Sequence, residues 1–287
     1  MKKYNVNGVD FFDWQGKPYC TIRQCGVEAT YPFEKPTTQF PIQAVLMDLD
    51  GTTVISEEFW IYLIEKTVKR LSSPAFCLSQ EDTPYVSGFS TAEHLEYCLK
   101  KYKIEKTVNE ALCVYHETAR EELCEIMQGR GNAEAFKPRE GLKAFLYALK
   151  RAGVKIGLAT SGLDYKAIPE IVSAFRVLGM GDPIAFYDAV ITGGRRKGEG
   201  EYGTIGEMAV KPHPWIYSEL LAGLGVEKSR AVVIEDSSAG LLAGRLAGLN
   251  VIGLKDGNLM QSGLHEACIA MADTLEEILD WLQIAKR

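Results

Sequence analysis

The sequence is poor in the features that mark secreted, membrane-spanning or nucleic-acid-binding proteins. Its 287 residues contain no apolar run long enough to cross a bilayer, and the lysines near the start lack the apolar stretch of a secretory signal. No long block of like charge occurs, and the formal net charge is −6. This balance argues against nucleic acid or an anionic membrane as the main partner. An anionic substrate would therefore need a local cation or a positive pocket.

The seven cysteines show no spacing that indicates a disulfide framework or a zinc site. Their number is odd, and no two of them form a Cys-x-x-Cys or zinc-ribbon pair. We therefore expect buried, reduced thiols in a cytoplasmic protein. With 46% hydrophobic and 24% charged residues, the chain has the composition of a globular protein that can bury a substantial core. Its length predicts one large domain or two small ones.

The most informative stretch is the segment 44–54, AVLMDLDGTTV, an apolar run that closes on two carboxylates. Asp48 and Asp50 are one residue apart, so they point to the same face at a strand end, and Gly51 then allows a sharp turn. Two acids in one small space repel each other unless a cation lies between them or one holds a proton. An isolated Asp-x-Asp-Gly is often a plain turn, but Thr52 and three downstream clusters favour chemistry here.

Hydrophobic periodicity divides the chain into three parts. Residues 1–40 have aromatics and prolines without a clear period, and we expect a mostly extended extension with one or two short strands. The pattern over 56–136 predicts an all-helical block of about four helices. Strands then alternate with helices, which predicts an α/β core formed by 41–55 and 137–287. The expected core elements are strands at 44–50, 154–160, 187–192, 231–235 and 250–254 and helices at 141–153, 164–178, 213–224, 238–247 and 274–285.

The α/β part is predicted to be a doubly wound parallel sheet, covered by helices on both faces. Right-handed crossovers place the carboxyl end of every strand at one edge, where ligands bind. The all-α block is inserted just after the first strand and leaves and returns at that same edge. It can therefore lie over the site as a lid.

Two further polar clusters fall at this edge before the last strands. Thr160, Ser161 and Gly162 end a strand, where a hydroxyl and backbone N–H groups suit a phosphoryl oxygen, although Ser161 could simply cap the next helix. Lys211 precedes a helix in a proline-stiffened segment. Its ammonium group could neutralise a phosphate or pair with Asp48, whereas a lone lysine at such a position is usually solvated surface.

Glu235 and Asp236 form the last cluster, at the end of the apolar strand 231–235. Uncompensated negative charge is costly there. A magnesium ion would remove that cost, because Mg²⁺ favours carboxylate and carbonyl oxygens. The alternative, in which Asp236 only caps the following helix, leaves Glu235 unexplained.

This series of clusters resembles the haloacid dehalogenase superfamily over about residues 41–287. The helical insertion looks like the helical cap of that superfamily, and residues 137–162 are also similar to it. Within the cap, Ser87 to Ser90 resemble the substrate loop of the β-phosphoglucomutase-like branch. The positions that match the four motifs of the superfamily are Asp48 and Asp50, Thr160 or Ser161, Lys211, and Glu235 with Asp236.

The resemblance implies a magnesium-dependent phosphomonoester hydrolase that acts on a small phosphorylated metabolite. Asp48 would be the nucleophile that takes the phosphoryl group, and Asp50 the acid that protonates the leaving oxygen and then activates water. An Asp at position 50 favours a phosphatase or phosphomutase over dehalogenation. The implied phosphate-binding residues are Thr160, Ser161, Gly162 and Lys211, and the implied metal ligands are the Asp48 side chain, the Asp50 carbonyl and Asp236, with Glu235 in or next to that shell.

Two alternatives stay open. A sugar phosphomutase would share the first half-reaction, but the cap has no arginine between Arg70 and Arg120 to hold a second phosphate. A binding protein on an inactive scaffold would use residues 1–40 or the loop 193–210 as contact surface, and the intact motif residues argue against it. A dinucleotide fingerprint at 198–203 is rejected, because it lies in a polar loop rather than between a strand and a helix. We expect a monomer or weak homo-oligomer.

Overall fold

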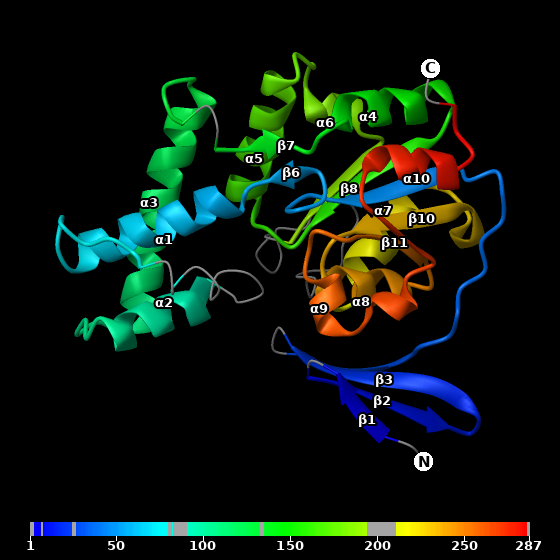
Figure 1. The fold of residues 1–287 in the computed structure, drawn as a ribbon, viewed down its shortest axis with the longest axis horizontal. Coiled ribbons are helices and arrows are strands. Elements are labelled where there is room, and N and C mark those ends of the chain that lie inside the picture. The colour runs from blue at the N-terminus through cyan, green and yellow to red at the C-terminus, as the bar shows by residue number, and fades with distance from the viewer. Residues whose placement is uncertain are drawn as a thin grey trace.

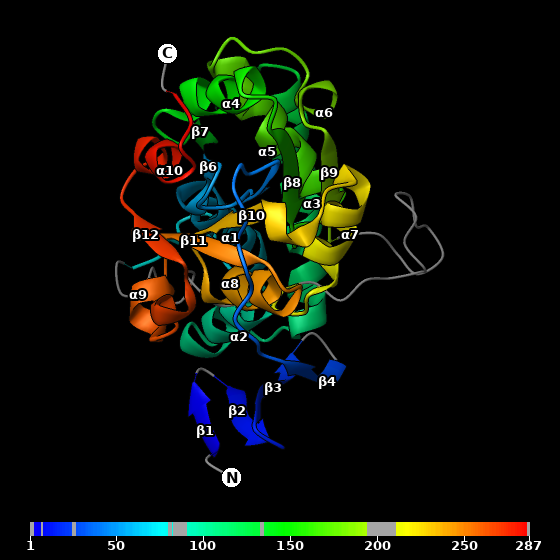
Figure 2. The same cartoon turned by 90° about the vertical axis from the view of Figure 1, so that its right-hand side faces the viewer.

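The computed structural model describes residues 3–6, 8–24, 27–79, 82, 91–132, 135–193 and 211–285. The predictions for Ser87 to Ser90, for the 198–203 segment and for most of the loop 193–210 fall outside these ranges. The central strands are β5 (Ala44–Asp48), β8 (Lys155–Thr160), β9 (Ala189–Thr192), β10 (Ala231–Glu235), β11 (Asn250–Leu254) and β12 (Ala270–Ala272). They form one sheet in the order β12-β11-β10-β5-β8-β9, in which every neighbouring pair is parallel (Figures 1 and 2).

Helices cover both faces of this sheet, which confirms the doubly wound α/β fold. Successive residues of β5 point to opposite faces: Val45 and Met47 join one apolar cluster with α4, α5 and α10, whereas Ala44 and Leu46 pack with α7 and α8. Strands that are covered on both faces have continuous apolar sequences. For this reason most of the strands of this sheet could be predicted from the sequence. The helices are α4 (Leu142–Arg151), α5 (Asp164–Val177), α6 (Pro183–Phe186), α7 (Trp215–Leu224), α8 (Ser238–Leu246), α9 (Leu259–Ser262) and α10 (Leu275–Trp281), with 3₁₀ turns at Lys228–Arg230 and His265–Ala267.

The shortest elements of the core were not predicted. The edge strand β12 has three residues and α9 has four, too few to show a hydrophobic period. The last helix ends at Trp281 rather than at 285. No helix in the described part of the chain is long and apolar enough to cross a membrane.

The inserted segment forms a group of helices beside the core (Figure 1). Its helices are α1 (Glu57–Leu71), α2 (Thr91–Lys101) and α3 (Val108–Met127). Thr107 starts α3 with a capping box, in which its side chain and Glu110 each accept a hydrogen bond from the other's backbone N–H. The strands β6 (Val54–Ile55) and β7 (Lys137–Pro138) pair where the chain leaves and re-enters the core. About four helices were expected; three lie within the described residues.

The N-terminal segment is more ordered than the expectation of one or two short strands. It forms a four-stranded antiparallel sheet from β1 (Lys3–Val6), β2 (Val9–Trp14), β3 (Lys17–Gln24) and β4 (Val27–Pro32). Its buried side chains Val9, Phe11, Cys20 and Ile22 join the apolar cluster of α7 and α8. Too few strands were predicted here because β2 has the sequence VDFFDW, in which Phe12 interrupts the alternation of apolar and polar residues that is typical of a strand.

Candidate active site

The first acidic pair lies at the carboxyl end of β5. Asp48 is the last residue of the strand and is only 6% exposed, whereas Asp50 lies in the following turn and is partly exposed. Gly51 has a φ of +80°, and a Cβ atom there would overlap the carboxylate of Asp236 at the end of the neighbouring strand β10. Glycine is therefore required for a turn that brings these three acids to one edge of the sheet.

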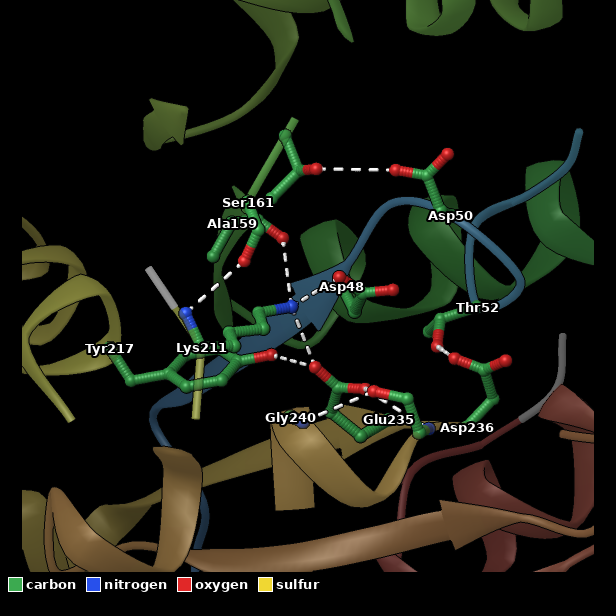
Figure 3. Close-up of polar contacts among 12 residues, drawn as sticks. Asp48, Asp50, Thr52, Ala159, Ser161, Lys211, Tyr217, Glu235, Asp236 and Gly240 are labelled. Carbon is green, nitrogen blue, oxygen red and sulfur yellow. Dashed lines mark hydrogen bonds and ion pairs between the residues drawn. The ribbon is translucent and has the colours of Figure 1, made fainter. Parts of the chain in front are cut away.

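Lys211 supplies the positive charge at this edge. Its ammonium group forms ion pairs with Asp48 Oδ1 and, at 2.6 Å, with Glu235 Oε1 (Figure 3). Its backbone N–H donates to Ser161 Oγ at 3.2 Å. This hydrogen bond links the segment 211–214, named the lysine loop below, to the end of β8. Burial alone would lower the pKa of Lys211, but the charges of Asp48 and Glu235 outweigh it and raise the pKa above its ordinary value. The lysine therefore stays protonated.

Glu235 is completely buried behind the lysine and does not line the cavity described below. Its Oε1 atom accepts hydrogen bonds from Lys211 Nζ and from Tyr217 Oη, each at 2.6 Å, and its Oε2 atom accepts one from Ser237 Oγ at 3.0 Å. A Cβ atom on Gly240 of α8 would overlap this carboxyl group, well inside the 3.0 Å that real Cβ atoms keep. The carboxylate is thus enclosed by partners on three elements.

Gly240 and Gly244, four residues apart in α8, are glycines for two different structural reasons. At Gly244, an added Cβ atom would meet Val251 and Val233, so this glycine allows close packing of α8 on the sheet. At Gly240, the obstacle is the carboxyl group of Glu235 instead. Gly240 therefore makes room for the polar site, whereas Gly244 makes room for the sheet.

Three carboxylates form a compact group that suits a divalent cation. Oxygen atoms of Asp48, Glu235 and Asp236 all lie within 4.8 Å of one another. Burial, followed by the charge of Glu235, raises the pKa of Asp236 to about 7 and that of Asp48 well above its ordinary value, while Lys211 opposes both shifts. An all-oxygen set of this kind is what Mg²⁺ prefers, and a bound divalent cation would counter the repulsion between the acids.

Asp50 is held on the opposite side of the turn by hydroxyl and indole groups. Its Oδ1 atom accepts from Ser56 Oγ at 3.0 Å and from Trp60 Nε1 at 3.1 Å. Its Oδ2 atom accepts from Thr160 Oγ1 at 3.2 Å, and that hydroxyl accepts from the Gly162 N–H at 2.9 Å. The interactions from Ser56 and Trp60 connect the acid to the beginning of the inserted helices.

Three further residues at this edge were not identified from the sequence. Tyr217 lies in an apolar stretch of α7, a position typical of a core residue. Glu170 of α5 is 1% exposed, its Oε1 atom has no hydrogen-bond partner among the described residues, and burial followed by the charge of Asp50 raises its pKa well above the ordinary value. Arg139 donates to the Thr52 carbonyl at 2.8 Å and pairs with Asp256 at 2.8 Å. Its only sequence signal was its place within the segment 137–162.

A cavity of about 770 Å³ opens at this edge between the inserted helices and the core. The walls come from α1, α2 and α3 on one side and from the strand ends of the core on the other. The sequence-predicted residues that line it are Asp48, Asp50, Thr160, Ser161, Gly162, Lys211 and Asp236. The structure thus brings every predicted site residue to one edge, with Glu235 behind the cavity wall.

Comparison with known proteins gives consistent matches. The family model of haloacid dehalogenase-like hydrolases matches residues 42–248. The phosphorylated carbohydrates phosphatase of Thermotoga maritima is 24% identical over 247 residues, which cover 84% of this chain and 99% of that protein. The crystal structure of CbbY from Rhodobacter sphaeroides in complex with phosphate has a TM-score of 0.59 at 22% identity and covers 83% of this chain and 96% of its own. A family IA hydrolase of Entamoeba histolytica has a TM-score of 0.61 at 20% identity, with 84% and 100% covered.

Proposed function

Because this chain belongs to the haloacid dehalogenase-like hydrolases, we propose that it is a magnesium-dependent phosphomonoester hydrolase acting on a small phosphorylated metabolite. The observation that carries the proposal is the buried pairing of Lys211 with Asp48 and Glu235 at the wall of a cavity that Asp50 also lines. The similarity to a phosphatase of phosphorylated carbohydrates supports the same substrate class.

Asp48 is proposed as the nucleophile. One of its carboxylate oxygens forms a bond to phosphorus while the bond between phosphorus and the ester oxygen breaks, which gives an aspartyl-phosphate. Lys211 touches this carboxylate and carries a positive charge, so it favours the ionised form against burial and the neighbouring acids, and it meets the charge of the phosphoryl oxygens. Thr160, Ser161 and Gly162 are proposed to bind the same oxygens with hydroxyl and N–H groups.

Asp50 is proposed to move the proton. It donates to the leaving ester oxygen in the first step and takes a proton from the attacking water in the second, when the bond from Asp48 to phosphorus breaks and inorganic phosphate leaves. The hydrogen bonds from Ser56, Trp60 and Thr160 hold both of its oxygens in place for this exchange.

The residues present fit a magnesium ion. Asp48, Asp236 and the carbonyl of Asp50 are proposed to hold it, with Glu235 alongside, and the bound ion would supply positive charge to the phosphoryl group. Both oxygens of Glu235 already accept hydrogen bonds from protein groups. Its main proposed role is therefore to position Lys211.

The inserted helices are proposed to be a cap domain over 56–136, on a catalytic core formed by 41–55 and 137–287. Residues 1–40 are then an extension outside the matched family region. Cap residues line the cavity, so closure of the cap would exclude bulk water while Asp50 works.

The test is a phosphate-release screen over sugar phosphates, nucleotides, phosphoglycolate and pyrophosphate with magnesium present. We expect turnover of at least one phosphomonoester, loss of it on chelation with EDTA and its return with Mg²⁺. Asp48→Asn should abolish turnover while the protein stays folded, and the exposed Asp13→Asn should not affect it. Turnover by Asp48→Asn near the wild-type rate, or full activity in EDTA, would remove the proposed roles. Faster formation of glucose 6-phosphate than of free phosphate from β-glucose 1-phosphate would indicate a mutase instead.

A further inference from the structure

The cavity contains a second ammonium group besides Lys211. Lys166 of α5 lines it, with Nζ 4.1 Å from the ring centroid of Trp60 and 5.3 Å from that of Tyr115. The same nitrogen is 3.2 Å from the Tyr115 hydroxyl, to which it donates a hydrogen bond. Trp60 belongs to α1 and Tyr115 to α3, so this lysine sits where the cap helices meet the core. Two aromatic rings fix the position of its charge.

Within the described part of the chain, this charge forms no ion pair with a carboxylate. Among the described residues, no carboxylate oxygen lies within 4.0 Å of Lys166 Nζ, whereas Lys211 has two acidic partners. Arg120 of α3 also lacks such a partner within the described chain, and its guanidinium lies 4.8 Å over Tyr165, the residue next to Lys166. Burial, followed by the charges of Lys166 and Arg120, lowers the pKa of the neighbouring His116. In a chain of net charge −6, two cations therefore lie close together here, of which Lys166 lines the cavity and Arg120 lies outside it.

We propose that Lys166, together with the Tyr115 hydroxyl, forms a second anion subsite, and that the substrate carries a carboxylate or a second phosphate besides the phosphoryl group that is transferred. The inference rests on the proposed phosphatase function for the position of the first phosphate, next to Lys211 and Asp48. A half-buried ammonium group that donates to a hydroxyl, and forms no ion pair among the described residues, gains a charge-assisted hydrogen bond when an anion binds. The cavity of 770 Å³ has room for a metabolite with two charged ends.

Lys166 could alternatively serve only to hold the cap to the core through Trp60 and Tyr115. A structural role and an anion-binding role of Lys166 predict different effects of its substitution on turnover. Loss of a structural contact would lower turnover of all phosphate esters together, since Trp60 also donates to Asp50. Loss of an anion subsite would act only on substrates with the second charge.

The experiment uses two matched substrate pairs that differ only in a CH₂OH group replaced by a carboxylate: glycerol 3-phosphate with 3-phosphoglycerate, and sorbitol 6-phosphate with 6-phosphogluconate. In the wild-type enzyme we expect the carboxylate member of at least one pair to have the higher kcat/KM by about 10- to 100-fold, the size of a hydrogen bond to a charged group. Lys166→Met should remove this preference, mainly through KM, and Lys166→Arg should restore part of it. The control Lys143→Met, on the exposed face of α4, should change neither pair.

A binding measurement separates this inference from the proposed function. Calorimetric titration of Asp48→Asn with both members of each pair, in the presence of magnesium, requires no turnover. If no pair is hydrolysed but a carboxylate member binds at least about tenfold tighter, and Lys166→Met cancels the difference, the subsite stands, and the phosphatase assignment falls if the wider phosphate-release screen also shows no turnover. Equal affinities within both pairs, or equal losses within each pair in Lys166→Met, would overturn the subsite.

Discussion

Gly240→Ala should damage the active site although it adds a single methyl group outside the cavity. The new Cβ atom would overlap the Cδ, Oε1 and Oε2 atoms of Glu235, all of them closer than 3.0 Å. That carboxylate cannot swing away cheaply, because it is completely buried and accepts hydrogen bonds from Lys211, Tyr217 and Ser237. Either α8 moves away from β10 or the carboxylate moves and takes Lys211 with it.

The magnitude follows from two opposing terms. Replacing a helical glycine by alanine stabilises a helix by up to about 1 kcal/mol, whereas overpacking a filled interior costs about 1–3 kcal/mol, and a strained ionic contact adds to that. The two terms leave a net loss of up to about 2 kcal/mol in the free energy of unfolding, and the strained ionic contact increases this loss. Because a misplacement of about 1 Å in a group that positions the chemistry can reduce the rate about 10²-fold, kcat should fall by at least that factor.

The matched control is Gly223→Ala in α7. A Cβ atom there would meet only the Ala189 Cβ at 3.7 Å, an ordinary contact, so the variant should gain up to about 1 kcal/mol and keep its activity. Urea unfolding and phosphate-release kinetics measure both quantities. Wild-type kcat and stability in Gly240→Ala would refute the reasoning, since they would mean that Glu235 relocates without cost.

Other predictions concern different parts of the molecule. Lys211→Met should reduce phosphate release to background and lower the free energy of unfolding in urea by about 3–5 kcal/mol, because two buried carboxylates lose their partner; a stable, active variant would contradict this. Hydrogen bonds from Lys101 and its neighbours outweigh burial and lower the pKa of Asp82 below 3.8, so its contribution to stability is present above pH 3.8 and is lost as the pH falls below it. The destabilisation caused by Asp82→Asn should accordingly be full at pH 7 and shrink below pH 3.8 in thermal unfolding; a pH-independent penalty would be inconsistent with the pairing. Tyr31→Phe removes the 2.8 Å hydrogen bond to His213 in the lysine loop and should lower kcat several-fold with little change in KM, while Tyr19→Phe, on the same sheet, should not; equal kinetics in both variants would show that the N-terminal sheet does not influence the loop.

Much of the core could be predicted because its strands are buried on both faces and end on polar groups. The apolar runs at β5, β8 and β10 each stop at a residue that carries charge or a hydroxyl, and parallel topology alone brings those ends together. The roles assigned to these residues remain predictions, but their common edge is a property of the fold.

The parts that escaped prediction depend on contacts between distant segments. A tyrosine in the apolar stretch of α7 gives no local sign that its hydroxyl reaches Glu235, and a glutamate inside a helix gives none that it is enclosed beside Asp50. The N-terminal sheet escaped for a related reason, since its apolar face is defined by α7 and α8 rather than by strict alternation within its own strands. Sequence patterns indicate the local hydrophobic period of a helix or strand, whereas contacts between distant segments form only when these elements pack together.

The N-terminal sheet also has a consequence for biosynthesis. Its apolar face is synthesised before the helices that cover it, which begin at Trp215, roughly 180 residues after the end of β4. At translation rates of about 5–20 residues per second, the nascent chain must carry this uncovered face for about ten to forty seconds. The N-terminal sheet can therefore bury this face against α7 and α8 only after both helices have been synthesised, late in the production of the chain.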